Sequence, residues 1–291
     1  MERVEPLQEE GTPRGATALD ADWVGLCRRV VAAQRQIFAE VRGVEARSTY
    51  DGIGEGGDRA LVIDRRCEDA VFAELEALAS DGASFLAISE ERGEVRFGGG
   101  GEAWVVIDPI DGSLNARRTI PSHSLSIAVA AGPTMADVRF AYVYDFGAGE
   151  EFCAAAGAGA TLDGRPISAP ENEHGLELIG VEAAKPERTV PVVSALVGEV
   201  YRLRAIGSIA ITLAYVAAGR LDGMLGLRPC RSVDAAAGQL IAREAGAGVA
   251  FGSLDLGEAR LGIEERYPIA AAAGAEGLAT LLAAQREGEE R

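Results

Sequence analysis

Residues 103–115 read AWVVIDPIDGSLN, and this stretch decides the fold. Its opening run, Ala103 to Ile107, is continuously apolar, which is typical of a strand that is buried on both faces. Pro109 has no N–H group for a sheet ladder, so we expect the strand to stop at Asp108. Asp108 and Asp111 then lie three residues apart across a tight bend.

The bend and the residues after it are suited to hold a metal ion and an anion. Gly112 supplies backbone freedom, and Ser113 is placed to cap a following helix. Two crowded carboxylates repel each other unless a cation lies between them, and Mg²⁺ prefers such oxygen ligands. A helix start beside them offers amide groups to an anion. The alternative is an Asp-Pro, Asp-Gly turn with solvated acids, which a bare D-x-x-D does not exclude.

The composition indicates an acidic globular protein. The 291 residues are 48% hydrophobic and 25% charged, enough for a large core in one or two domains. The net charge of -17 argues against a nucleic-acid partner. Four cysteines without C-x-x-C spacing, no signal peptide and no membrane-length apolar run lead us to expect a cytoplasmic protein with no membrane partner. With two histidines, zinc chemistry is not expected.

The first half of the chain, residues 20–156, reads as an α+β unit behind a disordered extension at 1–19. Apolar spacing predicts a helix from Asp20 to Gly43 and a second from Asp58 to Ala79. The segment 47–57 between them contains four glycines, and it reads equally well as an active-site lid or a plain connector.

Two pairs of acidic residues lie in the second predicted helix and after the strand that follows it. Asp64 and Glu68 share one face of the second helix, where solvated surface acids are the default. A strand at 84–89 ends directly in Glu90 and Glu91, so a second strand terminates in carboxylates. The glycine run 98–101 lacks the ending of a phosphate-binding P-loop, and we expect it to be a hairpin turn.

The remaining elements alternate differently along the chain. Antiparallel strands are expected at 122–131, 137–146, 150–156 and 160–168, and a further strand is expected at 177–182. The second half, residues 157–291, reads as a layered α/β unit. Its expected strands lie at 201–206, 221–227, 249–250 and 268–272, and its helices at 207–218, 232–245 and 276–286.

Three motifs then occur in a fixed order: Glu90-Glu91, DPIDGS at 108–113 and VDAAAG at 233–238. With them the chain resembles the inositol monophosphatase family, lithium-sensitive and Mg²⁺-dependent phosphatases related to fructose-1,6-bisphosphatases. The resemblance covers roughly residues 21 to 285. It implies an α+β fold layered as an α-β-α-β-α sandwich, a homodimer, and hydrolysis of a small phosphate ester.

The resemblance also implies a cofactor of two or three Mg²⁺ ions. It assigns Glu90, Asp108 and the carbonyl of Ile110 to the first ion. It assigns Asp108, Asp111 and Asp234 to the second.

The same resemblance implies catalytic and substrate-binding roles. Asp64 and Ser113 would activate the attacking water beside Glu90, with Glu91 a less certain partner of Glu90. The amides of Gly112 and Ser113 would hold phosphate oxygens. Gly207 and Ser208 would face the substrate.

One departure bears on the substrate. Leu227 stands where animal-type enzymes have an inositol-binding glutamate. Arg228 and Arg231 lie nearby in the sequence, and Arg204 precedes Gly207. This pattern resembles archaeal-type members that accept both inositol phosphate and fructose bisphosphate, because an arginine can grip a second phosphate. The alternative is that these arginines are surface salt-bridge partners.

Hydrolysis of inositol 1-phosphate or a similar sugar phosphate is therefore the leading hypothesis. A fructose-1,6-bisphosphatase is the runner-up, and a 3′-phosphonucleotide phosphatase is a further substrate alternative. A non-catalytic homologue that binds metal is the alternative from another class.

Overall fold

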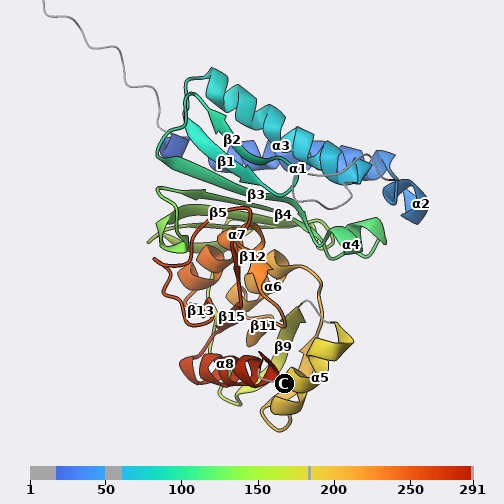
Figure 1. Ribbon diagram of the computed structural model, residues 1–291, viewed down its shortest axis with the longest axis vertical. Helices are drawn as coiled ribbons and strands as arrows, with labels where there is room; N and C mark the ends of the chain where they lie inside the picture. Colours follow the sequence, from blue (N-terminus) through green and yellow to red (C-terminus); the bar gives the residue numbers. More distant parts are fainter. Residues whose placement is uncertain (1–17, 50–60, 183–184, 290–291) are drawn as a thin grey trace, which may run out of the picture.

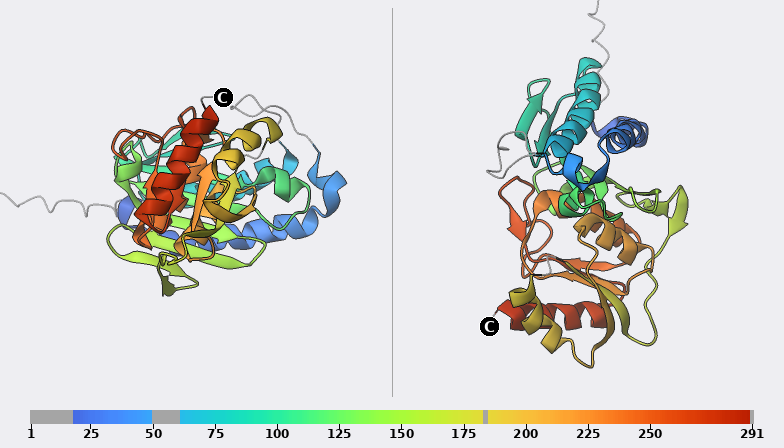
Figure 2. Two further views of the ribbon diagram at one scale, coloured as in Figure 1. Left: turned by 90° about the horizontal axis from the view of Figure 1, so that it is seen from below. Right: turned by 90° about the vertical axis from the view of Figure 1, so that its right-hand side faces the viewer.

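Helices and sheets alternate in five layers. The computed structural model describes residues 18–49, 61–182 and 185–289. In this part of the chain the layers follow the order α-β-α-β-α from top to bottom of Figure 1, and the side view in Figure 2 agrees. The outer helices are α1 (Trp23–Glu40) and α3 (Val62–Ser80) at one end and α5 (Pro186–Ala195) and α8 (Ala275–Glu289) at the other, while α6 (Ile209–Ala217) and α7 (Ser232–Glu244) lie between the sheets. The predicted α+β sandwich is confirmed.

The larger sheet has the strand order β2-β1-β3-β4-β5-β6-β7-β8. Only β1 and β3 pair in parallel, and the other neighbours are antiparallel. Its strands are β1 (Phe85–Ser89), β2 (Gly93–Phe97), β3 (Ala103–Asp111), β4 (Ser124–Ala130), β5 (Val138–Asp145), β6 (Glu150–Ala155), β7 (Gly159–Leu162) and β8 (Arg165–Ile167).

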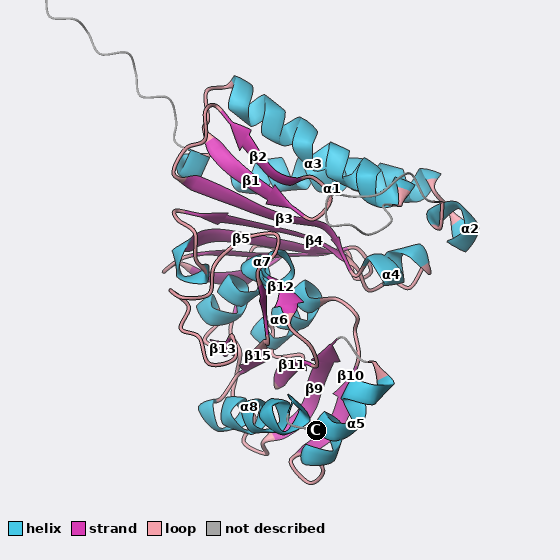
Figure 3. Cartoon of the chain, in the orientation of Figure 1, coloured by secondary structure: helices cyan, strands magenta, loops and turns pink. Residues whose placement is uncertain are grey.

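The smaller sheet has the order β10-β9-β11-β15-β13, and Figure 3 shows it between the two lower helical layers. Its strands are β9 (Leu176–Glu182), β10 (Val200–Arg204), β11 (Gly223–Gly226), β13 (Gly248–Ala250) and β15 (Ala270–Ala272), and β12 (Cys230–Arg231) pairs separately with β14 (Arg266–Tyr267). The chain leaves β9 to one side for β10 and returns to its other side for β11. Ligands of layered α/β sheets bind at the carboxyl ends of strands beside such a switch point.

Four short helical segments complete the described chain. They are η1 (Ala18–Asp20), α2 (Gly43–Arg47), α4 (Ser113–Arg117) and η2 (Met135–Asp137).

The apolar run at the start of β3 fills two cores at once. Val105 and Ile107 are buried against α1 and α3, whereas Val106 faces the core beneath, with α6 and α7. Because successive side chains of a strand point to opposite faces, both faces of β3 must be apolar. This is the pattern that the sequence predicts.

The structure corrects two expectations about the end of this strand. β3 does not stop at Asp108 but continues through Pro109 to Asp111, because a β-bulge there frees the proline from the regular ladder. Ser113 is the first residue of α4 and not its cap. Gly112 is the N-cap residue, in the left-handed conformation with φ of 89°.

The hairpin expected at residues 98–101 is also wrong. These glycines connect β2 to β3, which lie on opposite sides of β1, so the link crosses the start of β1. A Cβ atom at Gly101 would lie 2.2 Å from the carbonyl oxygen of Ser84, which explains a glycine there. The sequence analysis missed both β2 and α5.

Several expectations concern residues outside the described ones. They are the extension up to residue 17, the segment 50–57, and the predicted helical start at 58–60. Residues 18 and 19 were also expected to be disordered, but they belong to η1, where Ala18 is buried. Helix α3 begins at Val62. Among the described residues, no helix is long and apolar enough to cross a membrane.

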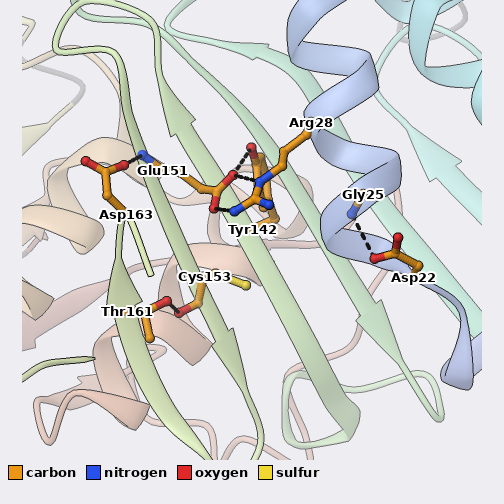
Figure 4. Close-up of polar contacts among 8 residues, drawn as sticks. All are labelled: Asp22, Gly25, Arg28, Tyr142, Glu151, Cys153, Thr161 and Asp163. Carbon is orange, nitrogen blue, oxygen red and sulfur yellow. Dashed lines mark hydrogen bonds and ion pairs between the residues drawn. The ribbon is translucent and has the colours of Figure 1, made fainter. Parts of the chain in front are cut away.

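Figure 4 shows how α1 is fixed to the larger sheet by a polar cluster. The Arg28 guanidinium donates two hydrogen bonds of 2.8 Å to the Glu151 carboxylate on β6, and the Tyr142 hydroxyl donates a third of 3.0 Å. The hydrogen bonds from Arg28 lower the pKa of Glu151, although burial opposes them.

We therefore expect Arg28→Met to lower the free energy of unfolding by about 1 kcal/mol at neutral pH, as measured by urea denaturation. Because folding lowers the pKa of Glu151, this carboxylate stabilises the folded state at pH values above its ordinary pKa of 4.5. The stabilisation is lost as the pH falls through the pKa of the folded state. The difference between variant and wild type should therefore shrink in acid. Arg29→Met is the control, because Arg29 makes a single 2.8 Å bond to Glu74. A difference that stays constant into acid would contradict this account.

Candidate metal centre

Three carboxylates from separate elements converge at the edge of the larger sheet. Glu90 directly follows β1, and Asp108 lies next to it on the parallel strand β3, where Ser89 and Ile107 are partners. Asp234 comes from the first turn of α7. One carboxylate oxygen from each lies within 4.8 Å of the others. An all-oxygen set of this kind fits a hard divalent cation such as Mg²⁺.

A β-bulge brings Asp111 into the same region as Asp108. Asp108 pairs with Ser126 of β4 and Asp111 pairs with Ser124, so three steps on β3 oppose two on β4. Residues three apart on a regular strand point to opposite faces, and the extra residue of a bulge returns them to the same face. Both aspartates are buried.

The start of α6 holds one oxygen of Asp111. Its Oδ2 atom accepts hydrogen bonds from the Ser208 hydroxyl at 2.5 Å and from the Ala210 amide at 2.7 Å. Anions are stabilised at helix N-termini, where amides are free. Ser208 is buried and also caps α6 by accepting from the Ile211 amide. Its hydroxyl therefore supports Asp111, whereas the sequence analysis expected it to face the substrate.

Burial and mutual repulsion raise the pKa of these acids. Burial raises the pKa of Asp108 well above its ordinary value, and the charges of Asp111 and Asp234 add to this. The pKa of Asp111 rises to about 7, again through burial first and Asp234 second. Burial also raises the pKa of Asp234, although nearby arginines oppose it. A bound cation would relieve all three.

Asp64 reaches this region from α3. Burial, followed by repulsion from Glu91, raises its pKa to about 7. Its Oδ1 atom is buried and has no hydrogen-bond partner among the described residues. A buried acceptor without a partner is costly, so this oxygen fits a bound water or ion. Its position corrects the default expectation of a solvated surface acid.

Glu68, one turn further along α3, is likewise not a surface acid. It is buried, accepts hydrogen bonds from the Ser89 hydroxyl and the Arg92 amide, and lies 3.6 Å from the Arg92 guanidinium. These contacts hold the turn that carries Glu90 and Glu91. Its position among Ile63, Cys67 and Val71 on the apolar stripe of α3 was the signal for burial.

Gln34 of α1 supports the bulge and was missed by the sequence analysis. It is fully buried, and its Nε2 atom donates to the carbonyls of Pro109 at 3.1 Å and Cys67 at 3.3 Å. Its place between Val30 and Ile37 on the apolar face of α1 was the available signal, since buried polar residues are uncommon.

Two glycine turns meet beside the acids. A Cβ atom at Gly112 would lie 2.8 Å from the Ser122 carbonyl and 3.0 Å from the Gly207 carbonyl. The Asn115 side chain donates to the carbonyls of Ser122 and Ile206, both at 2.8 Å. Gly112 and Gly207 therefore lie close together, and both were expected to line the substrate site. Ser113 is exposed beside them.

Three arginines lie close to the acidic cluster. Arg231 forms an ion pair with Glu90, and its backbone amide donates to Asp234 at 3.1 Å. Arg231, Arg228 and Arg266 all lower the pKa of Asp234. Arg266 was missed, because only the pairing of β12 with β14 places it opposite Arg231.

The remaining arginine expected at the site, Arg204, lies on the smaller sheet and not on the β12–β14 pair. Arg204 is exposed at the end of β10 and donates to the Leu203 carbonyl. Leu227, which follows β11, is buried.

Comparisons with known proteins agree on one family. A sequence model described as the inositol monophosphatase family matches residues 24–290. A fructose-1,6-bisphosphatase/inositol-1-monophosphatase of Thermococcus kodakarensis is 33% identical over 270 residues, 92% of this chain and 99% of that protein. Its namesake from Methanothermobacter thermautotrophicus is 32% identical over 234 residues, 77% of this chain and 82% of that protein. A crystal structure of an inositol monophosphatase-fructose 1,6-bisphosphatase has a TM-score of 0.78 at 27% identity, covering 91% of this chain and 100% of that one.

The raised pKa values predict how the stability of the chelated protein depends on pH. Asp64 and Asp111 bind protons more tightly when folded, at a pKa of about 7, than at their ordinary value of 3.8. The folded state therefore holds more protons between these values, and its stability falls as pH rises through that window.

Urea denaturation in EDTA should show lower stability at about pH 7.5 than at about pH 5.5, and saturating Mg²⁺ should remove or reverse the difference. Asp111→Asn, which has no carboxyl to titrate at this position, should have a shallower pH dependence in EDTA. Stability that rises over this range in EDTA would be the contrary result.

Proposed function

The chain belongs to the inositol monophosphatase family, and from that premise we propose that it is a Mg²⁺-dependent phosphatase that hydrolyses inositol 1-phosphate or a similar sugar phosphate. The observation that carries the proposal is the convergence of Glu90, Asp108 and Asp234 within 4.8 Å. A reading of these acids as solvated turn residues does not account for the burial of Asp108 and Asp111 or for the orphaned Oδ1 atom of Asp64.

In the proposed centre, two or three Mg²⁺ ions share these carboxylates. Glu90, Asp108 and the Ile110 carbonyl would hold one ion, and Asp108, Asp111 and Asp234 a second. Oδ2 of Asp111 is engaged by α6, and its other oxygen would be available to the ion. Bound Mg²⁺ would neutralise phosphate oxygens and make water a better nucleophile at neutral pH.

The chain's own residues would orient water and substrate. Asp64 can accept a proton from the attacking water at its buried Oδ1 atom and later release it, because this oxygen has no hydrogen-bond partner among the described residues. The exposed Ser113 hydroxyl would help to hold that water. The amides of Gly112 and Ser113 would bind phosphate oxygens at the start of α4, and Gly207 would close the opposite wall.

Two features support fructose 1,6-bisphosphate as a second candidate substrate. Arg228 and Arg266 lie close enough to lower the pKa of Asp234, so a substrate in the centre could present a second phosphate to them. The archaeal relatives are also named for both activities. Further parts of the proposal are a homodimer and a cytoplasmic location.

The test of the proposed function is phosphate release with Mg²⁺ from inositol 1-phosphate, fructose 1,6-bisphosphate and a 3′-phosphonucleotide, side by side. Preference for inositol 1-phosphate supports the proposal, and preference for the bisphosphate favours the second candidate. Activity on the nucleotide alone would contradict both. Mg²⁺ binding without turnover of any substrate would identify a non-catalytic homologue.

Asp108→Asn should remove turnover and leave the fold intact, because it deletes a charge that both proposed ions use. Loss of a residue that only hydrogen-bonds to a metal ligand typically lowers metal affinity by roughly 10- to 100-fold. Because Asp108 is itself a proposed ligand, we expect its loss to lower Mg²⁺ affinity by at least as much. Phosphate release measures turnover, isothermal titration measures Mg²⁺ affinity, and circular dichroism reports whether the fold is intact. Asp81→Asn, at the exposed end of α3, is the control and should match wild type. Near-normal turnover in Asp108→Asn would rule out the ligand assignment.

Arg228→Ala should reduce activity on fructose 1,6-bisphosphate selectively. Loss of a charge-assisted bond of about 1.5–3 kcal/mol corresponds to roughly a 10- to 100-fold fall in kcat/KM. Activity on inositol 1-phosphate should change little, because it carries no second phosphate. Arg165→Ala, at an exposed site on β8, is the control. An equal fall on both substrates would show that Arg228 does not read the second phosphate.

A further inference from the structure

Glu182, the last residue of β9, is a buried acid that the proposed chemistry does not use. It is 2% exposed and lies at the carboxyl end of the strand beside the switch point of the smaller sheet. Burying a carboxylate is costly unless several donors compensate it. The hydrogen-bond partners of the Glu182 carboxylate therefore indicate its role.

The Glu182 carboxylate binds the turn that joins β10 to α6. It accepts hydrogen bonds from the Ile206 amide at 3.0 Å and the Gly207 amide at 2.8 Å. The Thr212 hydroxyl lies 2.8 Å from its Oε1 atom and 2.6 Å from the Ser208 carbonyl oxygen. Each contact thus fixes part of the turn 206–208 or the first turn of α6.

The other side of this turn faces the candidate metal centre. The Ile206 carbonyl accepts from the Asn115 side chain, and the Gly207 carbonyl lies against Gly112. Ser208 extends its hydroxyl to Asp111. The turn is therefore clamped between Glu182 and the two segments that carry the proposed phosphate and metal ligands.

We propose that Glu182 is a positioning residue of the active site. Through the turn 206–208 it orients Ser208 toward Asp111 and sets the substrate-facing wall at Gly207. The inference rests on the proposed function, because Asp111 and Gly207 act there as metal ligand and substrate wall. Glu182 itself touches neither substrate nor metal.

Glu182→Gln is the decisive variant. An amide of the same shape removes the charge and turns an NH₂ group toward backbone N–H donors, which cannot accept it. The turn should loosen, Mg²⁺ should bind about 10-fold more weakly, and KM should rise, as is typical when outer partners of a ligand are lost. At saturating Mg²⁺ and substrate, kcat should stay close to wild type.

Glu244→Gln is the matched control for a merely structural role. Glu244, at the end of α7, also accepts from two backbone amides, those of Gly157 and Gly159, both at 2.9 Å. This variant should lower the melting temperature without changing Mg²⁺ affinity or KM. Thr212→Val, which removes only the hydroxyl, should change both in the same direction as Glu182→Gln but less.

Isothermal titration with Mg²⁺, steady-state kinetics and thermal unfolding of the full chain separate the outcomes. Wild-type Mg²⁺ affinity and KM in Glu182→Gln would overturn the positioning role while leaving the proposed function intact. Equal changes in Glu182→Gln and Glu244→Gln would overturn it as well. A wild-type chain that neither binds Mg²⁺ nor hydrolyses a phosphate ester would overturn the proposed function, and this inference with it.

Discussion

The removal of neighbouring carboxylates from water at one end of the larger sheet is the constraint on which the rest of the structure depends. Burial raises the pKa of Asp108, Asp111 and Asp234, and the charges of neighbouring aspartates raise the pKa of Asp108 and Asp111 further. Such an arrangement destabilises the chain unless protons or cations neutralise it. It persists because rigid elements impose it: two parallel strands, a bulge and the first turn of a helix. A cluster of acids that could hold a metal ion is therefore part of the fold.

The surrounding contacts keep these acids apart from bulk solvent and in register. Glu68 ties the turn after β1 to α3, and Gln34 ties the bulge to α1. The start of α6 engages one oxygen of Asp111. None of these groups needs to touch a substrate. Each limits the freedom of a carboxylate, so the protein itself largely sets the geometry of the acids.

Features set by residues close together in the sequence could be predicted, whereas contacts between residues far apart in the sequence could not. The apolar run of β3 and the motif after it are local signals that were read correctly from the sequence, whereas the layered fold was expected from the family that the three motifs resemble. Gln34 and Glu68 carried a weaker signal, as polar residues on apolar helical stripes. Arg266 carried none, since only the pairing of β12 with β14 brings it near Asp234. The bulge at Pro109 was read as a strand end, because a proline alone does not distinguish the two.

The most direct test of the central claim is anomalous diffraction from crystals grown with Mn²⁺ in place of Mg²⁺. The account predicts an anomalous peak within coordination distance of carboxylate oxygens from Glu90, Asp108 and Asp234. A structure in which these carboxylates remain paired with arginines and protein amides, with Mn²⁺ bound elsewhere or not at all, would contradict it.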